Sequence, residues 1–206
     1  MKIVIDGNIG AGKSTLLNEL NNKHKYIICK EDIEVWKPWL SLFYKNPKRN
    51  SFGFQLRVLL SHLKHKDCDS NNPREPVFLE RSPSTCNNIF GVLLKGTGDL
   101  TNLEYKLCEE YEKEFGWNPD IYIYLYTTPE ICHKRIKKRN RQGEETISIE
   151  YLTKVHNQYE NVYKNLLQNS FLNKTKIYKI DASKSTNYII EEILNILNPI
   201  KLNTHF

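Results

Sequence analysis

The sequence predicts an α/β protein with a parallel sheet of five strands that is flanked by helices. Short apolar runs alternate with longer amphipathic runs along the 206 residues, which is the order that builds parallel strands with helical crossovers. The run 121–126, Ile-Tyr-Ile-Tyr-Leu-Tyr, is apolar on both faces, as in a central strand covered on each side. A glycine-rich segment follows the first apolar run and precedes an amphipathic one, the place of a strand-to-helix loop.

Each expected strand is a short apolar run, and each expected helix is a longer amphipathic one. Thr128 fits a helix N-cap with Pro129 at the first helical position, and residues 67–75 form an expected exposed turn. The expected strands are Lys2–Asp6, Tyr26–Lys30, Val77–Glu80, Ile121–Tyr126 and Lys176–Ile180. The expected helices are about Ser14–Asn22, Pro47–Lys66, Pro83–Lys95, Thr101–Phe115, Pro129–Arg139, Ile149–Leu167 and Asn187–Leu197.

Length and composition limit the class of protein. The length favours one domain over residues 1–206, and the balance of 39% hydrophobic and 26% charged residues is that of a soluble globular chain. No apolar run approaches the roughly 20 residues of a membrane span, and the N-terminus becomes acidic too early for a secretory signal. We therefore expect a cytoplasmic protein without a membrane partner, with the mitochondrial matrix as the alternative.

Cysteine usage indicates the redox compartment, and the net charge limits the kinds of partner. The five cysteines are odd in number and form no CxxC pair, which favours a reducing compartment and argues against a disulfide scaffold or a zinc site. The formal net charge of +6 suits nucleic acid, anionic lipid or a small phosphorylated ligand. Charge alone does not choose among these three.

The segment 7–14, Gly-Asn-Ile-Gly-Ala-Gly-Lys-Ser, fits the phosphate-binding pattern GxxxxGK[ST] in full. Glycines let backbone N–H groups face the phosphates, and the following helix N-terminus adds about half a positive charge. Lys13 is expected to reach the β- and γ-phosphates, and the Ser14 hydroxyl to bind Mg²⁺. A chance glycine turn and a non-catalytic nucleotide site are the alternatives. The expected phosphate-binding residues here are Gly7, Asn8, Ile9, Gly10, Ala11, Gly12, Lys13, Ser14 and Thr15.

Two carboxylates stand at strand ends, where parallel sheets bind ligands. Glu31 follows the second expected strand and could take a proton from an attacking hydroxyl. Glu80 ends the third and is followed by Arg81, a pair that could serve Mg²⁺ and a phosphate or substrate together. From spacing alone, solvated charges at strand ends are an equally good interpretation.

With these motifs in order, the sequence resembles the cellular deoxynucleoside kinases, the family of deoxycytidine kinase, mitochondrial thymidine kinase and the insect multisubstrate enzyme. The resemblance runs from Lys2 to about Leu167. It implies a P-loop kinase fold, a lid with arginines at about residues 135–146, ATP with Mg²⁺, and a homodimer through helices 47–66 and 83–95. Beside the phosphate loop it rests on the blocks Glu31–Trp36, Phe43–Arg49, Ser51–Gln55, Glu80–Ser82 and Arg135–Tyr151.

The resemblance also implies the site. The catalytic residues would be Glu31 as the base for the 5′-hydroxyl, Arg81 as its orienting partner, and Lys13. Mg²⁺ would associate with Ser14 and Glu80. The substrate pocket would contain Gln55 reading the base edge, Phe90 stacked on the base, Trp36 and Phe54 as walls, and Tyr44 with Glu144 at the sugar 3′-hydroxyl. On composition alone Trp36, Phe54 and Phe90 would be ordinary core aromatics, and Tyr44 a surface tyrosine.

The segment 134–141 is the densest positive run, and a solvated helix face, a nucleic-acid patch and a phosphate-closing lid all fit it. Arg135 and Arg139 are four residues apart and share a helix face, and Arg141 follows the helix. The resemblance favours the lid, with these three arginines over ATP and no nucleic acid as a partner. The loop Asp181–Ser185 resembles the adenine-backing loop, although a helix-capping turn explains it equally well.

The sequence departs from the family beside the base. Members that favour deoxycytidine and purines carry an Arg–Asp pair there, and the matching residues here are His62 and Cys86. Val58 resembles the bulkier residue of pyrimidine-preferring members. We therefore expect thymidine as the preferred substrate, with deoxyuridine and deoxycytidine accepted. His62 could donate to a carbonyl or be solvated, and Asn87 stands where relatives usually have arginine.

Three other functions fit parts of the sequence. A nucleoside monophosphate kinase of the thymidylate kinase type shares the loop and lid, but should present arginine rather than Glu31 near the second strand. A non-catalytic P-loop relative has less use for Lys13, Glu31 and Arg81 together. A nucleic-acid-binding ATPase would need an aspartate after an apolar strand and a further basic patch.

Overall fold

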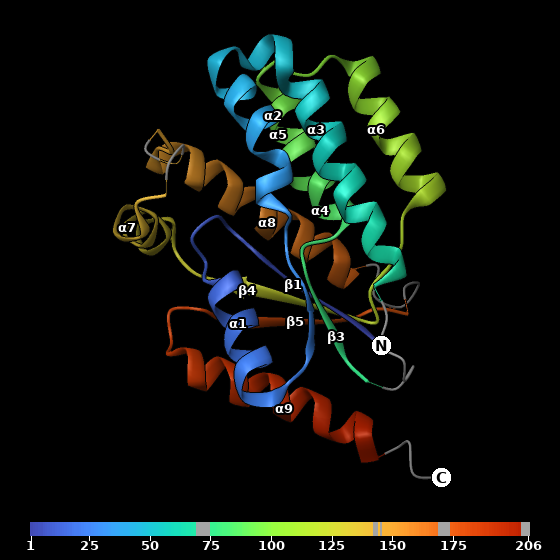
Figure 1. The fold of residues 1–206 in the computed structure, drawn as a ribbon, viewed down its shortest axis with the longest axis vertical. Coiled ribbons are helices and arrows are strands. Elements are labelled where there is room, and N and C mark those ends of the chain that lie inside the picture. The colour runs from blue at the N-terminus through green and yellow to red at the C-terminus, as the bar shows by residue number, and fades with distance from the viewer. Residues whose placement is uncertain (69–74, 142–143, 145, 169–173, 203–206) are drawn as a thin grey trace.

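The computed structural model describes residues 1–68, 75–141, 144, 146–168 and 174–202 (Figure 1). Its centre is an all-parallel sheet of five strands in the order β2-β3-β1-β4-β5, which confirms the predicted fold class. All the expected strands are present, with ends shifted by at most one residue. They are β1 (Lys2–Gly7), β2 (Ile27–Cys29), β3 (Val77–Glu80), β4 (Ile121–Tyr126) and β5 (Lys176–Asp181).

Helices cover both faces of the sheet. The helices α1 and α9 lie on one side, whereas α8 crosses the other side beneath the group α2, α3, α5 and α6 (Figure 1). The helical segments are α1 (Lys13–His24), α2 (Ile33–Lys45), α3 (Pro47–Lys64), η1 (His65–Asp67), α4 (Pro83–Thr85), η2 (Cys86–Gly91), α5 (Val92–Gly96), α6 (Asn102–Phe115), α7 (Pro129–Arg139), α8 (Ile149–Gln168) and α9 (Thr186–Leu202).

The side chains of β1 explain the two apolar layers. Successive residues of a strand point to opposite faces. Ile3 and Ile5 therefore pack in the cluster that α1 and α9 complete, whereas Val4 packs with Tyr159 of α8 in the other cluster. Because the carboxyl ends of β1, β2 and β3 lie along one edge, the loops that follow them meet there.

Two helical segments differ from the expectation. Helix α2 was not predicted, and it contains Pro38, which removes a backbone donor and normally ends or kinks a helix. The expected helix 83–95 is present but is interrupted by η2, a π-helical turn over Cys86–Gly91. Such turns are frequent at functional sites, and this one borders the cavity described below.

The sequence argued against a disulfide scaffold, and the described residues contain one cysteine pair, together with the free thiols of Cys86, Cys108 and Cys132. Cys29 at the end of β2 forms a disulfide with Cys68 after η1, with 7.0 Å between the Cα atoms. The two are 39 residues apart, so only the folded chain reveals the pair.

Within the described residues, no helix has the length and apolar character of a membrane span.

Candidate functional site

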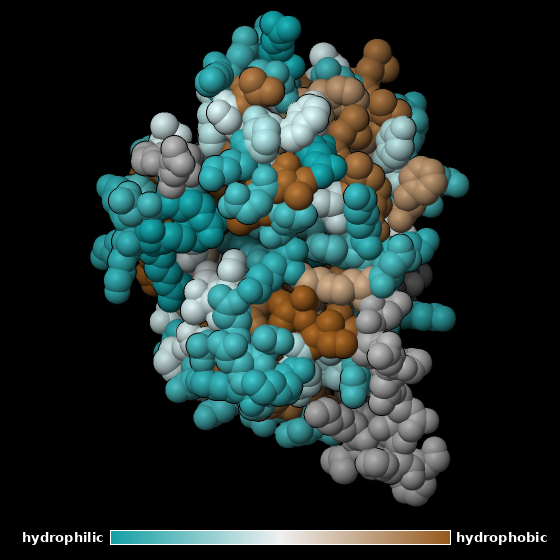
Figure 2. Space-filling view, in the orientation of Figure 1, coloured by the Kyte–Doolittle hydropathy of each residue, from teal (hydrophilic) through white to brown (hydrophobic). Residues whose placement is uncertain are grey.

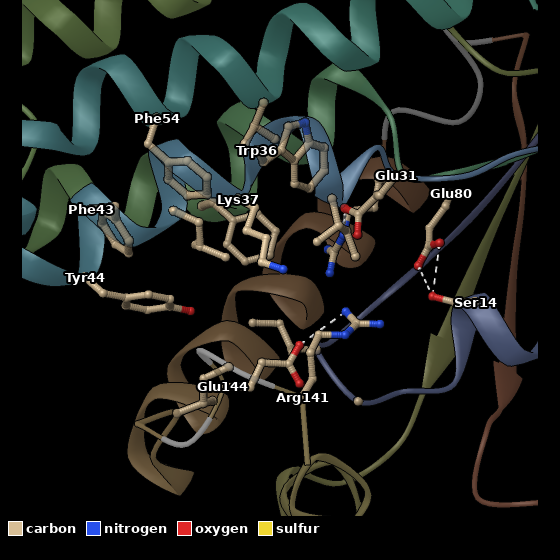
Figure 3. A pocket seen from close by; sticks show the side chains of 18 of the residues that line it. Ser14, Glu31, Trp36, Lys37, Phe43, Tyr44, Phe54, Glu80, Arg141 and Glu144 are labelled. Carbon is tan, nitrogen blue, oxygen red and sulfur yellow. Dashed lines mark hydrogen bonds and ion pairs between the residues drawn. The ribbon is translucent and has the colours of Figure 1, made fainter. Parts of the chain in front are cut away.

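A cavity of about 600 Å³ opens at the carboxyl edge of the sheet, between the phosphate loop, α2, α3 and the residues of the expected lid (Figure 3). Every residue expected to contact the substrate lines this cavity. These residues are Glu31, Trp36, Tyr44, Phe54, Gln55, Val58, Arg81, Cys86, Phe90 and Glu144. Lys13, Ser14, Arg139 and Arg141 line it as well, so the loop and the lid share one cavity with the expected acceptor site.

The phosphate loop is wound by its glycines. Gly10 and Gly12 have φ angles of +83° and +103°, which strain other residues, and a Cβ on Gly10 would lie 2.6 Å from the carbonyl oxygen of Cys132. Asn8 anchors the loop, because its Nδ2 donates to the Leu152 carbonyl at 2.9 Å. Gly7, Asn8 and Ala11 shape the loop without lining the cavity, whereas Ile9, Gly10, Gly12 and Thr15 line it.

Lys13 is buried at the base of this loop. Its Nζ donates to the carbonyls of Gly7 and Asn8 at 3.1 and 3.0 Å. Burial, and then the nearby Arg81 cation, lower the pKa of Lys13 to about 8. A phosphate group beside Nζ would restore the charged form, which suits a lysine whose predicted role is to bind phosphate.

Ser14 and Glu80 are joined directly. The Ser14 hydroxyl donates to both carboxylate oxygens of Glu80, at 2.9 and 3.1 Å (Figure 3). One hydroxyl and one carboxylate are hard oxygen ligands of the kind that Mg²⁺ prefers when it also binds phosphates. Within the described ranges, no group of three or more His, Cys, Asp or Glu side chains is placed to hold a metal ion. The donor set therefore fits a phosphate-bound Mg²⁺ rather than a closed protein site.

Buried Arg81 and partly buried Glu31 form an ion pair. Arg81 Nε lies 2.7 Å from Glu31 Oε1, and the Arg81 backbone has a φ of +64°, which is unusual outside glycine. Burial raises the pKa of Glu31, and the Arg81 cation counteracts part of that effect. The pair also has an aromatic neighbour, because the Arg81 guanidinium lies 4.8 Å from the centre of the Phe90 ring.

A buried network behind Arg81 was missed by the sequence analysis. Arg81 Nη1 donates to the hydroxyl of Tyr159, which donates in turn to Asp6 Oδ1 at 2.7 Å. Asp6 is fully buried, and it also accepts from Tyr122 at 3.2 Å and from Thr85. The network therefore holds the guanidinium at Nη1, whereas Glu31 holds it at Nε. The only sign of this network in the sequence was Asp6, an acidic residue inside the first apolar run.

Gln55 and η2 are tied together at the expected base-binding end. Gln55 Nε2 donates to the Cys86 carbonyl at 2.6 Å and lies 3.4 Å from Asn87 Oδ1. Burial raises the pKa of the Cys86 thiol well above its usual range, so this position carries no charge. Asn87 is fully buried and donates to Cys108 O and Glu112 Oε2 at 2.9 and 2.6 Å, which joins η2 to α6.

His62 is fully buried, so the interpretation of a solvated histidine was wrong. It lines the cavity, with its ring edge-on to Trp36 at 5.7 Å between centroids. Burial, His65 and Arg81 lower its pKa well below 6.5, so the imidazole is neutral at physiological pH. The two positions that match the family's Arg–Asp pair thus carry uncharged side chains, His62 and Cys86.

The lid arginines bind Glu144 in this structure. Arg139 Nε and Nη2 donate to Glu144 Oε2 at 2.9 and 2.6 Å, and Arg141 Nη1 lies 3.4 Å from Glu144 Oε1. Tyr44 and Glu144 both point into the cavity (Figure 3). Residues 142, 143 and 145 of the expected lid, and 69–74 of the expected turn, lie outside the described residues.

Arg135 differs from the other two arginines. Its Nη1 donates to Ala11 O at 3.0 Å and its Nη2 to Ala182 O at 2.9 Å, and it does not line the cavity. Arg135 lies one helical turn before Arg139. Through these two hydrogen bonds it joins the backbone of the phosphate loop to the loop after β5.

The loop after β5 has its own local hydrogen bonds. Asp181 accepts from the Ser183 amide at 2.8 Å, and the Ser185 hydroxyl accepts from the Tyr188 amide at 3.3 Å. The local bonds are those of a capping turn, and its adenine-backing role stays a prediction.

Comparison with known proteins gives consistent matches. The profile of a family described as deoxynucleoside kinase matches residues 3–202. A probable deoxycytidine kinase of fowlpox virus is 36% identical over 165 residues, covering 77% of this chain and 70% of the relative. A putative kinase of invertebrate iridescent virus 3 is 32% identical and covers 95% of both chains. The structure of a deoxyadenosine kinase from M. mycoides, with dCMP and dCDP bound, has a TM-score of 0.84 and 30% identity, covering 97% of this chain and all of that one.

Proposed function

Because the chain belongs to the deoxynucleoside kinase family of phosphotransferases, we propose that it moves the γ-phosphate of ATP to the 5′-hydroxyl of a pyrimidine deoxynucleoside, with thymidine preferred, in nucleotide salvage. The single observation that carries the proposal is the common cavity of Glu31 and the phosphate loop. A carboxylate and a phosphate-binding loop that face one space can bring a hydroxyl and a phosphate into line.

Each residue of the site has a role in this reaction. Arg81 holds Glu31 Oε1, which leaves Oε2 to accept the proton of the 5′-hydroxyl. The raised pKa of Glu31 makes it a better proton acceptor near neutral pH than an exposed glutamate. The loop amides and Lys13 hold the phosphates of ATP, and Arg139 and Arg141 stand beside the same cavity.

Ser14 and Glu80 are the residues that would hold Mg²⁺. When bound, the ion neutralises charge on the phosphate oxygens. Glu144 is the expected ligand of the sugar 3′-hydroxyl, but it is held by Arg139 and Arg141 here. We infer that nucleoside binding draws Glu144 toward Tyr44, which would release the two guanidinium groups toward the phosphates.

The uncharged side chains at the base-binding end support the proposed pyrimidine preference. The neutral Cys86 thiol and the neutral His62 imidazole offer no charged pair to an exocyclic amino group. Val58 occupies space beside them, as expected for a site that accepts a small ring with a methyl group. A site that discriminates by shape rather than charge separates substrates by roughly 1–3 kcal/mol per methylene-sized change.

An acceptor panel tests the proposal. The protein is incubated with Mg-ATP and thymidine, deoxyuridine, deoxycytidine, deoxyadenosine, deoxyguanosine or thymidylate, and ADP release and product mass are measured. We expect ADP only with a nucleoside present, and the highest kcat/KM with thymidine. Turnover of thymidylate alone would favour a monophosphate kinase, and no turnover with any acceptor would favour a non-catalytic relative. A purine as the best acceptor would overturn the pyrimidine preference.

We also propose a homodimer, through α3 and α6. On α6 the side chains of Leu103, Leu107, Tyr111 and Phe115 are exposed at four-residue spacing, and Leu60 is exposed on α3. Figure 2 shows apolar residues gathered over this part of the molecule. The resemblance implied an interface through helices 47–66 and 83–95, but the segment 83–95 is largely buried against the rest of the chain, so we place α6 there instead. An exposed apolar stripe of this kind suits a self-complementary two-fold interface.

The dimer is tested by replacing Leu103 and Leu107 with glutamate, which places charges in the stripe. Sedimentation should show a dimer for the wild type and a monomer for the double variant. Tyr188→Glu on α9, at an exposed aromatic residue outside the stripe, should stay dimeric. A wild type that sediments as a monomer at all micromolar concentrations would contradict the proposal.

A further inference from the structure

His62 has an unmet capacity for hydrogen bonds. It is fully buried, yet neither ring nitrogen has a hydrogen-bond partner in the part of the chain that the structure describes. Glu31 Oε1 is 4.0 Å from Nε2, which is beyond hydrogen-bond distance. The rings of Trp36 and His65 pack edge-on against it. A buried polar group without a partner is destabilising, so a group that enters the cavity is needed to satisfy it.

The position of His62 along α3 is fixed. Gln55, Val58 and His62 are spaced by three and four residues, so they share one face of the helix, and all three line the cavity. Trp117 Nε1 donates to the His62 carbonyl at 2.9 Å, and Trp36 Nε1 donates to Ser61 Oγ at 2.9 Å. These bonds hold the end of α3. The imidazole therefore stays about 10 Å along the helix axis from Gln55, near Glu31.

The shape of a nucleoside places one edge of the base at His62. In the anti conformation of a pyrimidine nucleoside, the C5–C6 edge lies on the side of the 5′-hydroxyl, and the Watson–Crick edge points away from it. With the 5′-hydroxyl at Glu31 and the Watson–Crick edge at Gln55, the C5 substituent faces the α3 residues between them, Val58 and His62. This step rests on the proposed function, because it uses the roles of Glu31 and Gln55.

We propose that His62 determines specificity by forming a hydrogen bond with a polar C5 substituent, so that 5-hydroxymethyl pyrimidine deoxynucleosides are better substrates than thymidine. A neutral imidazole has one donor and one acceptor nitrogen, and a hydroxyl group can complement either. The methyl group of thymidine fills the same space but leaves His62 unpaired. The hydroxymethyl group fills the space and supplies the partner.

Substrate analogues test the proposed hydrogen bond on the wild-type protein. We compare kcat/KM for 5-hydroxymethyl-2′-deoxyuridine with that for 5-ethyl-2′-deoxyuridine, whose substituent has the same number of heavy atoms, and with that for thymidine. A net hydrogen bond predicts about a three- to tenfold preference for the hydroxymethyl compound over both. Equal or higher kcat/KM with the ethyl compound would overturn the inference. If thymidine itself is not phosphorylated, the proposed function fails rather than this step.

Variants assign the preference to His62. His62→Leu should abolish or reverse the hydroxymethyl-to-ethyl ratio, and His62→Gln, which keeps a donor and an acceptor, should retain part of it. His65→Leu is the matched control: it removes the ring packed on His62 but does not line the cavity, so the ratio should be unchanged. Ratios within one enzyme cancel any loss of folded protein.

A comparison of purine nucleosides tests whether His62 instead forms its hydrogen bond with purine N7. Purine N7 lies on the corresponding edge of the base, so deoxyadenosine is compared with its 7-deaza analogue in the wild type and in His62→Leu. The inference predicts that the variant changes the pyrimidine ratio. A change confined to the purine pair would show that His62 reads N7, and would overturn the pyrimidine assignment.

Discussion

Replacing Glu31 by glutamine is expected to lower kcat by about 10²- to 10⁴-fold, while the Kd for Mg-ATP stays close to that of the wild type. Glutamine keeps the shape of the side chain and an oxygen that can face Arg81 Nε, now 2.7 Å from Oε1, but it cannot accept a proton. ATP contacts are supplied by other residues of the cavity, Lys13 among them. The measurements are steady-state turnover of thymidine and titration calorimetry with ATP. Glu191→Gln on α9, which is exposed, is the control.

The pH profile supplies an independent check on the same residue. Glu31 acts as a base only when ionised, and burial raises its pKa above the 4.5 of an ordinary glutamate. The kcat/KM for thymidine should therefore fall as the pH is lowered through that raised pKa, at higher pH than an exposed carboxylate would produce. The glutamine variant should lose this limb of the profile. Turnover near the wild-type rate in Glu31→Gln would remove Glu31 from the base role.

The fold was largely predictable because its signals are local. Each strand of the sheet is an apolar run, and each crossover helix repeats its apolar residues at helical spacing. The exceptions are positions where tertiary packing overrides a local preference. Helix α2 contains Pro38, and its Trp36 is nevertheless buried and hydrogen-bonded to Ser61 of α3. The π-helical turn η2 is likewise stabilised from outside, by Gln55 and by α6 through Asn87.

The site was predictable only in part. The phosphate loop follows from spacing alone, whereas the substrate residues came from the family resemblance, and the structure gathers them around one cavity. The sequence does not show which distant residues pair with one another. Tyr159 meets Asp6 across 153 positions, and the link from Arg135 to Ala182 spans 47. The burial of His62 is of the same kind, because the histidine at this position looks polar and solvated until α2 and Trp36 cover it.

Replacing Arg81 by lysine is expected to lower kcat by about 10²- to 10³-fold, although the positive charge is retained. Arg81 contacts Glu31 through Nε and Tyr159 through Nη1, with Asp6 Oδ1 3.6 Å away. A lysine ammonium is a single point of charge and cannot meet both sides at once. The measurement is single-turnover phosphorylation of thymidine at saturating ATP. Arg49→Lys on α3, which is exposed and does not line the cavity, should behave as the wild type.

Tyr159→Phe separates the charge of Arg81 from its orientation. The variant keeps the ring that stacks on Tyr124 at 5.5 Å, but removes the hydroxyl that accepts from Arg81 and donates to Asp6. Because hydrogen bonds to charged groups contribute about 1.5–3 kcal/mol, kcat should fall by about 10- to 100-fold, with little change in KM for ATP. If Arg81 acted through its charge alone, Arg81→Lys would keep most of its activity and Tyr159→Phe all of it. If kcat falls in both variants, and falls further in Arg81→Lys, the guanidinium must be held in one orientation between Glu31 and the Asp6 network.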